Sequence, residues 1–304
     1  MNESAFTFCN AAGTDIHVHR WSPDSKPRAA VQIAHGAAEH GARYARFARR
    51  LTAAGFVVYA NDHRGHGRTA GTLDRAGIAG PDGWNGMVDD LHRLTAIIRE
   101  AQPGLPIFLF GHSLGSLMTQ QYIQHWGDEL AGAVLCGTFG DSPGVAELLP
   151  MLAMAAEAAP EAPSEMYAAM FDEFNKPFAP GETGFEWLSR DGAEVRKYVA
   201  DPWCGFAFSN ALVYDNLRAT LKIWDPASEA GIPPDLPLLL IAGDRDPAGR
   251  NGESVHQLAL RYRRQGIRHV SEILYPDARH EILNETNREQ VEQDVVAWLD
   301  HQLP

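Results

Sequence analysis

Short apolar runs alternate with stretches of helical periodicity along most of this chain. Tyr44, Phe47 and Leu51 recur at helical spacing, as do Met87, Leu91 and other residues between the runs. Strands joined through helices pair in parallel and have helices on both faces. We therefore predict an α/β fold with a mostly parallel central sheet, preceded by a hairpin that covers residues 6–9 and 16–21. The apolar runs lie at 30–34, 56–60, 107–110, 133–136, 236–242 and 270–274.

The alternation stops between residues 141 and 225. This stretch is rich in Ala, Met, Phe and Trp and is interrupted by Pro and Gly. We predict two or three helices there and no strand. Because the strand pattern resumes afterwards, we favour a helical cap inserted into a core of residues 1–140 and 226–304. A separate small domain is the alternative.

Charge and cysteine content limit the partners and the compartment. The formal net charge of −13 disfavours nucleic acid and favours a neutral or locally cationic partner. Cys9, Cys136 and Cys204 are widely spaced, which predicts neither a disulfide framework nor a zinc site and favours a reducing, cytoplasmic location. The N-terminus lacks the features of a secretory signal, and the apolar stretch 148–156 is too short to span a bilayer.

A GxSxG motif occupies the turn after one predicted strand. Gly111-His112-Ser113-Leu114-Gly115 follows the run 107–110 and precedes a helix that we expect from about 114 to 126. In this context the serine is a nucleophile on a strained turn, and the small flanking residues let strand and helix pack closely. A phosphate-binding loop would need a GK[ST] sequence, which is absent here.

A base and an acid for Ser113 occur in the order that this arrangement requires. Asp244 and Asp246 follow the run 236–242, and His280 follows the run 270–274. Because the carboxyl ends of parallel strands share one edge of a sheet, these side chains can meet there. His280 would take the proton from Ser113, and an aspartate would orient His280. Proximity alone does not choose between the two aspartates.

The developing oxyanion needs two backbone N–H donors. One is expected from Leu114, the residue after the nucleophile. We assign the other to Ala37, in the loop that follows the run 30–34. Leu114 and Ala37 are therefore the predicted oxyanion hole.

Five sequence blocks carry a resemblance to a known family. The chain resembles the monoacylglycerol lipase and lysophospholipase branch of the α/β-hydrolases, which is related to serine aminopeptidases. The similarity runs from about residue 15 to 300 and is weakest in the insertion, where Asp201-Pro-Trp-Cys-Gly-Phe206 is similar to bacterial members. The blocks are His35-Gly-Ala-Ala-Glu-His-Gly-Ala-Arg-Tyr44, Asn61-Asp-His-Arg-Gly-His-Gly67, GHSLG, Gly243-Asp-Arg-Asp246 and Arg279-His-Glu281.

The resemblance implies a cap over the site, no cofactor, and cleavage of esters with one acyl chain. Its GxxD spacing selects Asp246 over Asp244 as the acid. It also implies that Glu39 and Arg43 lie near the end of the site that receives the alcohol. This chain has Ala38 where the branch usually has glycine.

A metal site is not indicated by the histidines. His35, Glu39 and His40 do not match an HxxEH motif, and the block Asp62–His66 has no recognised ligand spacing. We interpret the turn at 62–67 as an organiser of its loop. No metal is expected.

The sequence thus predicts a serine esterase that acts on a lipid-like ester through an acyl-enzyme. The cap would supply the acyl-chain surface and could contact a membrane or micelle transiently. One alternative is a peptidase or amidase whose acidic cap residues hold a free amino terminus; Glu157, Glu161, Glu165, Asp172 and Glu173 are available. Another is a non-catalytic ligand-binding relative. Acyl length, headgroup and oligomeric state stay open. The apolar cap residues are Leu148, Leu149, Met151, Leu152, Met154, Met166, Met170, Phe171, Phe174 and Phe178.

Overall fold

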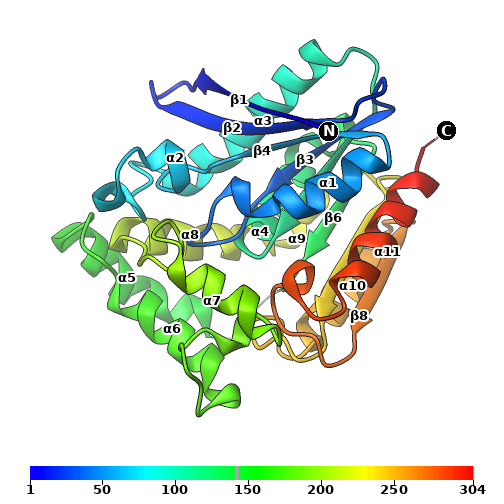
Figure 1. Cartoon of the computed structure of the whole chain (residues 1–304). Coiled ribbons are helices and arrows are strands. Elements are labelled where there is room, and N and C mark those ends of the chain that lie inside the picture. Colours follow the sequence, from blue (N-terminus) through cyan, green and yellow to red (C-terminus); the bar gives the residue numbers. More distant parts are fainter. Residues whose placement is uncertain (141–143, 304) are drawn as a thin grey trace.

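An eight-stranded sheet runs through the centre of the molecule (Figure 1). The structure, a computed structural model, describes residues 1–140 and 144–303. The strand order is β1-β2-β4-β3-β5-β6-β7-β8; β1, β2 and β4 pair antiparallel, and all later pairs are parallel. The predicted α/β fold with a mostly parallel sheet is confirmed. The strands are β1 (Asn2–Cys9), β2 (Asp15–Ser22), β3 (Ala29–Ala34), β4 (Phe56–Asn61), β5 (Ile107–His112), β6 (Gly132–Cys136), β7 (Leu238–Gly243) and β8 (Val270–Tyr275).

Helices cover both faces of this sheet. The described α-helices are α1 (Ala45–Ala53), α2 (Gly67–Ala70), α3 (Gly83–Ala101), α4 (Leu114–Trp126), α5 (Val145–Ala158), α6 (Glu165–Asn175), α7 (Gly192–Ala200), α8 (Asn210–Ile223), α9 (Pro226–Glu229), α10 (Glu253–Arg264) and α11 (Arg288–His301). Helices α1 and α11 pack on one face, and α3, α4 and α10 pack on the other.

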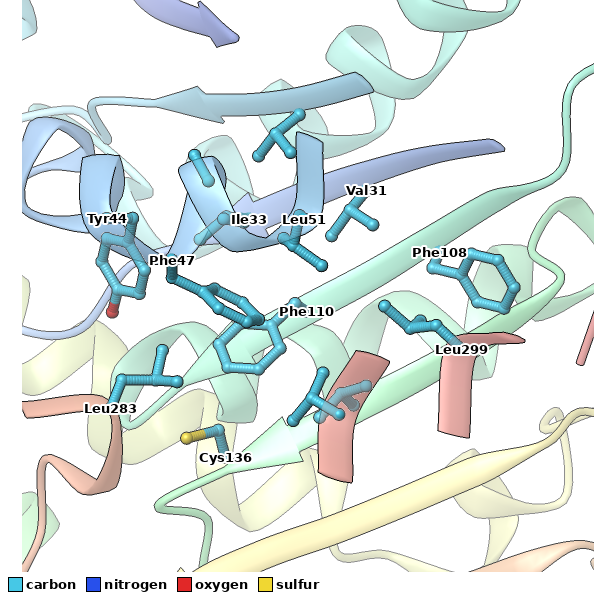
Figure 2. Packing of buried hydrophobic residues seen from close by; sticks show 14 of the residues in the cluster. Val31, Ile33, Tyr44, Phe47, Leu51, Phe108, Phe110, Cys136, Leu283 and Leu299 are labelled. Carbon is cyan, nitrogen blue, oxygen red and sulfur yellow. The ribbon is translucent and has the colours of Figure 1, made fainter. Parts of the chain in front are cut away.

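The two faces follow from alternation along the strands. Val31 and Ile33 of β3 face α1 and α11, whereas the intervening Gln32 donates to the carbonyl oxygen of Leu91 in α3. Figure 2 shows the α1 face, where Phe47 packs against Phe110 of β5 with ring centroids 5.1 Å apart. Side chains of successive strand residues point to opposite faces, so each central strand is buried on both sides. This fixes the carboxyl ends of β5, β7 and β8 relative to one another.

The region between β6 and β7 is helical, but it holds more helices than the sequence predicts. Helices α5, α6, α7 and α8 lie there, so the expectation of two or three is wrong. The additional helix is short: α7 has nine residues, and its first turn is capped by Asp191, which accepts from the N–H of Ala193 at 3.0 Å. Such a short helix carries little periodic signal. In Figure 1, α5, α6 and α7 lie together beyond one end of the sheet.

Helix α8 packs on the sheet side of this region. One buried cluster joins Leu212 and Val213 of α8 to Leu91 of α3 and Leu117 of α4. The division at 141–225 stays a prediction, and its residues 141–143 lie outside the described ones. Among the described residues, no helix combines the length and the hydropathy that crossing a membrane requires.

Candidate active site

Ser113 lies at the junction of β5 and α4, on a backbone that few residues adopt. Its φ is 52° and its ψ is −118°. A non-glycine residue in such a conformation is strained and persists only where its surroundings fix it. Here the Ser113 N–H donates to the carbonyl oxygen of Cys136 on β6 at 2.9 Å. Gly111 and Gly115 allow the turn, because a Cβ on Gly111 would collide with Gly115 and one on Gly115 would collide with Ala34.

His280 connects Ser113 to Asp246. Its Nε2 is 2.8 Å from Ser113 Oγ, and its Nδ1 is 2.8 Å from Asp246 Oδ2. His280 and Asp246 are buried. The carboxylate accepts from Nδ1–H, which leaves Nε2 as the acceptor for the serine hydroxyl. The structure thus brings together the serine, the histidine and the second of the two candidate aspartates.

The surroundings of His280 shift its pKa upward. Burial alone would lower the pKa of His280, but the charge of Asp246 and its hydrogen bond outweigh that effect, and the pKa of His280 is raised above its ordinary 6.5. Asp246 is held in turn, since its Oδ1 accepts from the N–H of Ala248 at 2.9 Å. This arrangement suits a base that must carry a proton briefly while a substrate reacts.

Asp244 lies outside this chain of hydrogen bonds. Its Oδ1 accepts from the backbone N–H of Asp277 at 2.7 Å, at the protein surface. That is the common use of an aspartate that stabilises a turn. Asp244 thus joins the loop after β7 to the loop after β8 and does not contact His280.

Ala37 and Leu114 border the same cavity as Ser113 and His280. Leu114 is the first residue of α4, where backbone N–H groups have no partner within the helix. Among residues 1–140 and 144–303, neither of these two N–H groups donates a backbone hydrogen bond in a turn, a loop or a helix cap. Both positions can therefore supply the donors that an oxyanion needs.

Hydrogen bonds to three other segments of the chain fix the loop that carries Ala37. The next residue, Ala38, has a φ of 50°, in the left-handed region that glycine adopts without strain. Its N–H donates to His66 Nε2 at 3.4 Å, and its carbonyl oxygen accepts from Tyr198 Oη and from the N–H of Gly205, each at 3.0 Å. These contacts explain how alanine is kept where the resembled branch has glycine.

Three buried histidines, His35, His63 and His66, form hydrogen bonds within and next to this loop. His35 Nδ1 donates to the carbonyl oxygen of Gly36 at 2.8 Å, and its Nε2 accepts from the N–H of His63 at 3.0 Å. His63 Nε2 donates to the carbonyl oxygen of His35 at 3.2 Å. Burial lowers the pKa of His63 to about 3 and that of His66 to about 4. The rings are therefore neutral at physiological pH, and each holds a fixed tautomer.

Glu39 and Arg43 belong to a buried ion cluster beside Ser113. Glu39 accepts from the N–H of Gly36 at 2.6 Å and from Tyr44 Oη at 2.8 Å. Arg43 donates to Glu39 at 2.5 Å and makes two hydrogen bonds to Glu281, of 2.7 and 2.8 Å. Burial would raise the pKa of Glu281, but Arg43 outweighs it and the pKa falls to about 2. Glu39 borders the small space next to Ser113, whereas Arg43 lies behind it.

A cavity of about 400 Å³ opens from Ser113 and His280 into the helical region. Five of the ten apolar residues predicted for the acyl surface line it: Leu148, Met166, Met170, Phe171 and Phe174. The other five do not: Leu152 packs into the core, Met151 and Met154 face outward, Phe178 packs against the cluster of Trp187, and Leu149 is likewise absent from the wall. Most of the remaining wall comes from residues that sequence reasoning missed. They include Trp84, Leu117, Phe139 and Phe208, together with Val213, Asn216, Leu217 and Thr220 of α8 and the nearby Trp224.

Trp187 is a second residue that the sequence did not reveal. Its ring centroid is 4.8 Å from that of His280, and its carbonyl oxygen accepts from the N–H of His280 at 3.3 Å. It sits in a short 3-10 turn between α6 and α7. No motif surrounds it, so only its aromatic character within an apolar insertion could have drawn attention to it.

One group of side chains in the described residues has the composition of a metal site. His40, Asp201 and Cys204 each offer a ligand atom, and these atoms lie within 4.8 Å of one another. His40 Nε2 and Asp201 Oδ2 are 3.0 Å apart, as in a hydrogen bond. The contact ties the loop at 35–44 to the segment after α7, which accounts for the cluster without a metal.

Comparison with known proteins identifies the family of this chain. Residues 25–287 match the model of the family described as serine aminopeptidase, S33. The monoacylglycerol lipase of Mycolicibacterium smegmatis is 30% identical over 301 residues, which cover 97% of this chain and 96% of that protein. The monoglyceride lipase of Homo sapiens is 28% identical over 242 residues, covering 78% of this chain and 71% of the relative.

A solved structure extends the similarity over the whole chain. The structure of a thermostable carboxyl esterase from Bacillus coagulans, in complex with glycerol, superimposes with a TM-score of 0.92 at 32% identity and covers 100% of both chains. Family, relatives and solved structure agree on the fold and on the class of reaction. The chain is an α/β-hydrolase and a carboxylic ester hydrolase, and it belongs to the serine aminopeptidase, S33 family.

Proposed function

We propose that this protein hydrolyses esters of a single acyl chain, monoacylglycerol first among them, through an acyl-enzyme. One observation carries the proposal: the Ser113–His280–Asp246 hydrogen bonds lie at the mouth of an apolar cavity large enough for an acyl chain. The names of the relatives support the same class of substrate. Lysophospholipids are the second substrate to test.

Attack begins with proton transfer. His280 Nε2 accepts the proton of Ser113 Oγ as that oxygen attacks the ester carbonyl. The imidazolium that forms is stabilised by Asp246, and the raised pKa of His280 reflects this stabilisation. The N–H groups of Ala37 and Leu114 donate hydrogen bonds to the carbonyl oxygen as it becomes negatively charged.

Collapse of the tetrahedral intermediate releases the alcohol. His280 returns its proton to the departing oxygen, and the acyl group stays on Ser113. In this proposal the departing alcohol lies on the side of the small space bordered by Glu39, Tyr198 and His280. Glycerol is bound in the structure of the similar Bacillus coagulans esterase, which supports glycerol as that alcohol.

Water completes the cycle. His280 takes a proton from water, which attacks the acyl carbonyl; the carboxylic acid then leaves and Ser113 regains its proton. The same two N–H groups stabilise the second oxyanion. Apart from water and the ester itself, both halves of the reaction need only groups that the chain supplies.

The exposed face of α5 and α6 supports transient contact with a membrane or micelle. Met151 and Met154 are 54% and 73% exposed, and Leu148 and Met170 are both partly exposed and part of the cavity wall. Apolar side chains on this face would bury their surface in a lipid aggregate. An acyl chain could then pass from the aggregate into the cavity. In this proposal the helices of residues 141–225 act as the cap.

The cysteines support a reducing compartment. Cys9, Cys136 and Cys204 are all unpaired, and Cys136 is buried. Buried free thiols persist where disulfides do not form. We therefore keep the cytoplasm as the proposed location.

The structure gives no support to a peptidase that holds a free amino terminus. Such an enzyme needs a carboxylate facing the substrate, but the described lining of the main cavity contains no acidic side chain. The five acidic residues available for that role are all exposed. Glu39 and Glu281, which border the smaller space, are paired with Arg43. An amide substrate with a free amino group would find no unpaired partner here.

The decisive experiment compares four substrate classes with purified protein. Monoacylglycerols, lysophospholipids, 4-nitrophenyl esters and aminoacyl-naphthylamides are assayed for kcat/KM at neutral pH. Monoacylglycerols and long-chain esters should be turned over and naphthylamides should not. Faster turnover of the naphthylamides would refute the proposal. A fluorophosphonate that fails to label the protein would instead favour a non-catalytic binding protein.

A further inference from the structure

The indole of Trp187 lies against the imidazole of His280. The two ring centroids are 4.8 Å apart, and the ring planes are inclined by 35°. Trp187 is 4% exposed, and it lines both the acyl cavity and the small space beside Ser113. Aromatic rings at this separation attract each other beyond the area that they bury. A residue of the helical insertion therefore contacts the candidate base directly.

The hydrogen bonds of His280 change during the proposed reaction. Its Nε2 meets Ser113 Oγ first, then the departing alcohol and then water, whereas the bond from Nδ1 to Asp246 persists. One hydrogen bond restrains rotation about the Cβ–Cγ bond only weakly, because such a torsion has broad minima. Packing against the imidazole must therefore keep Nε2 directed at the reacting atoms.

The turn that carries Trp187 is bonded to the segment that carries His280. The carbonyl oxygen of Trp187 accepts from the N–H of His280 at 3.3 Å. Arg279 Nη1 donates to the carbonyl oxygens of Glu186 and Ser189, at 2.5 and 3.2 Å. The two segments are thus joined on both sides of Trp187, which fixes the indole relative to the imidazole.

Helix α6 holds the indole as well. The ring centroids of Phe171 and Phe174 lie 5.4 and 5.1 Å from that of Trp187. Asn175, the last residue of α6, accepts from the N–H of Trp187 at 3.0 Å through its Oδ1. The described lining of the acyl cavity does not include Asn175, so this residue acts on Trp187 without bordering the acyl chain.

We propose that Trp187 is a positioning residue for the base, an inference that rests on the proposed ester hydrolysis. Its indole keeps the imidazole of His280 aligned between Ser113 and Asp246 while the partner of Nε2 changes. A residue that only lines the cavity would affect long acyl chains and spare short ones. A residue that positions the base affects every ester, because each one needs the same proton transfers.

The test compares 4-nitrophenyl acetate with 4-nitrophenyl dodecanoate. In folded protein, Trp187→Leu should lower kcat and kcat/KM roughly 10- to 100-fold for both esters, with KM for the acetate changed less than about twofold. Trp187→Phe should restore most of the loss, because a ring again lies beside His280. The indole Nε1 has no hydrogen-bond partner among the described residues, so phenylalanine loses no hydrogen bond. A loss confined to the dodecanoate in Trp187→Leu would overturn the proposal.

Trp224 supplies the matched control. It lines the same cavity, and its described contacts are to the ring of Phe139 and to Gln120. Trp224→Leu should change turnover of the dodecanoate and leave that of the acetate unaltered. An equal loss of acetate turnover in Trp224→Leu and Trp187→Leu would show that the effect does not come from contact with His280 and would overturn the proposal.

Asn175→Ala repeats the test with the cavity wall unchanged. It removes the acceptor of the Trp187 N–H and should lower kcat for both esters by roughly threefold or more. Circular dichroism and Tm establish which variants are folded. Should Trp187→Leu not fold, Asn175→Ala decides, and an unchanged kcat in that variant would overturn the positioning role.

Labelling of Ser113 separates this inference from the proposed function. Diisopropyl fluorophosphate carries no long chain; Ser113 Oγ displaces its fluoride while His280 takes the hydroxyl proton. Slower labelling of Trp187→Leu, restored in Trp187→Phe, would support the positioning role even if the wild type hydrolysed no ester, in which case the proposed function alone would fail. Equal labelling rates of the wild type and Trp187→Leu would refute the positioning role, while ester hydrolysis could still hold.

Discussion

The backbone N–H of Glu281 donates to the carbonyl oxygen of Leu188 at 2.7 Å. This bond, one residue beyond His280, joins the loop after β8 to the helical insertion. A neighbouring carboxylate strengthens the junction: Glu285 accepts from the N–H groups of Arg190 and Arg279 at 3.0 and 2.9 Å. The insertion is therefore fastened to the loop that holds the candidate base.

Replacement of Glu285 should loosen that junction. The carboxylate is fully buried and also pairs with Arg190 Nε at 2.8 Å, so Glu285→Ala removes five acceptor contacts and leaves the Arg190 guanidinium without its carboxylate partner. We expect a loss of about 3 kcal/mol of unfolding free energy, measured by urea denaturation. Glu289→Ala, on the exposed start of α11, is the control. A change below about 0.5 kcal/mol for Glu285→Ala would contradict the anchoring.

Ser113→Ala should abolish ester hydrolysis in a folded protein. Removing the nucleophile of an acyl-enzyme mechanism typically lowers kcat by several orders of magnitude. Circular dichroism and Tm should show an intact fold, and a fluorophosphonate should modify the wild type once, at Ser113. Near-normal turnover by the variant would exclude this serine as the nucleophile.

Asp246→Asn should be far more damaging than Asp244→Asn. Asparagine keeps the size of Asp246 but presents an N–H to His280 and favours the wrong tautomer, so kcat should fall by roughly two to four orders of magnitude with KM less affected. Among the described residues the Asp244 carboxylate accepts a hydrogen bond from the Asp277 N–H alone, and its replacement should cost less than about threefold. A larger loss in Asp244→Asn would reverse the assignment of the acid.

The pH dependence of kcat/KM should report the raised pKa of His280. A protonated His280 accepts no proton from Ser113, so activity falls as pH drops through that pKa. Because Asp246 raises the pKa above 6.5, the acid limb should lie above pH 6.5. Rate profiles from pH 5 to 9 measure it, with Asp244→Asn giving the same limb. A limb clearly below pH 6.5 would show that the charge of Asp246 does not act on the base.

The chain-length profile should depend on Leu217. Each methylene buried in the cavity contributes about 0.8 kcal/mol, so kcat/KM should rise roughly fourfold per carbon until the cavity is full. Leu217→Trp replaces a leucine of the wall with a bulkier indole ring and should move the optimal acyl-chain length to shorter chains. An ester series from acetyl to palmitoyl measures this, with the exposed Leu73→Trp as control. A wild-type profile that peaks at acetate would contradict the acyl cavity.

The sequence predicted the sheet because its signals are local. Buried parallel strands such as β5 and β7 are short apolar runs, and the residues that follow them must meet at one edge. This logic also brought Ser113 and His280 together as candidates. Choosing Asp246 needed the family spacing, since both aspartates lie in one loop and differ only in which one faces the histidine.

The insertion was less predictable for a physical reason. Apolar residues there either line the cavity or pack on the core, and periodicity does not separate the two: Leu148 lines it, whereas Leu152, one turn later, is buried in the core. Trp187 and Asn216 reach the cavity wall through tertiary packing that no local pattern encodes. Their roles follow only from which surfaces α8 and the 3-10 turn at Trp187 present to the cavity.

The linked rings of His35, His63 and His66 also bear on how substitutions in this chain should be interpreted. None of the three touches the substrate in the proposed mechanism, yet each serves as both donor and acceptor to neighbouring backbone or side-chain groups. A substitution scan should therefore show low tolerance at these positions, as at Ser113, although the cause is different. Loss of activity on substitution at 35, 63 or 66 would reflect a changed conformation of the loop that carries Ala37. These three positions should also vary together among relatives.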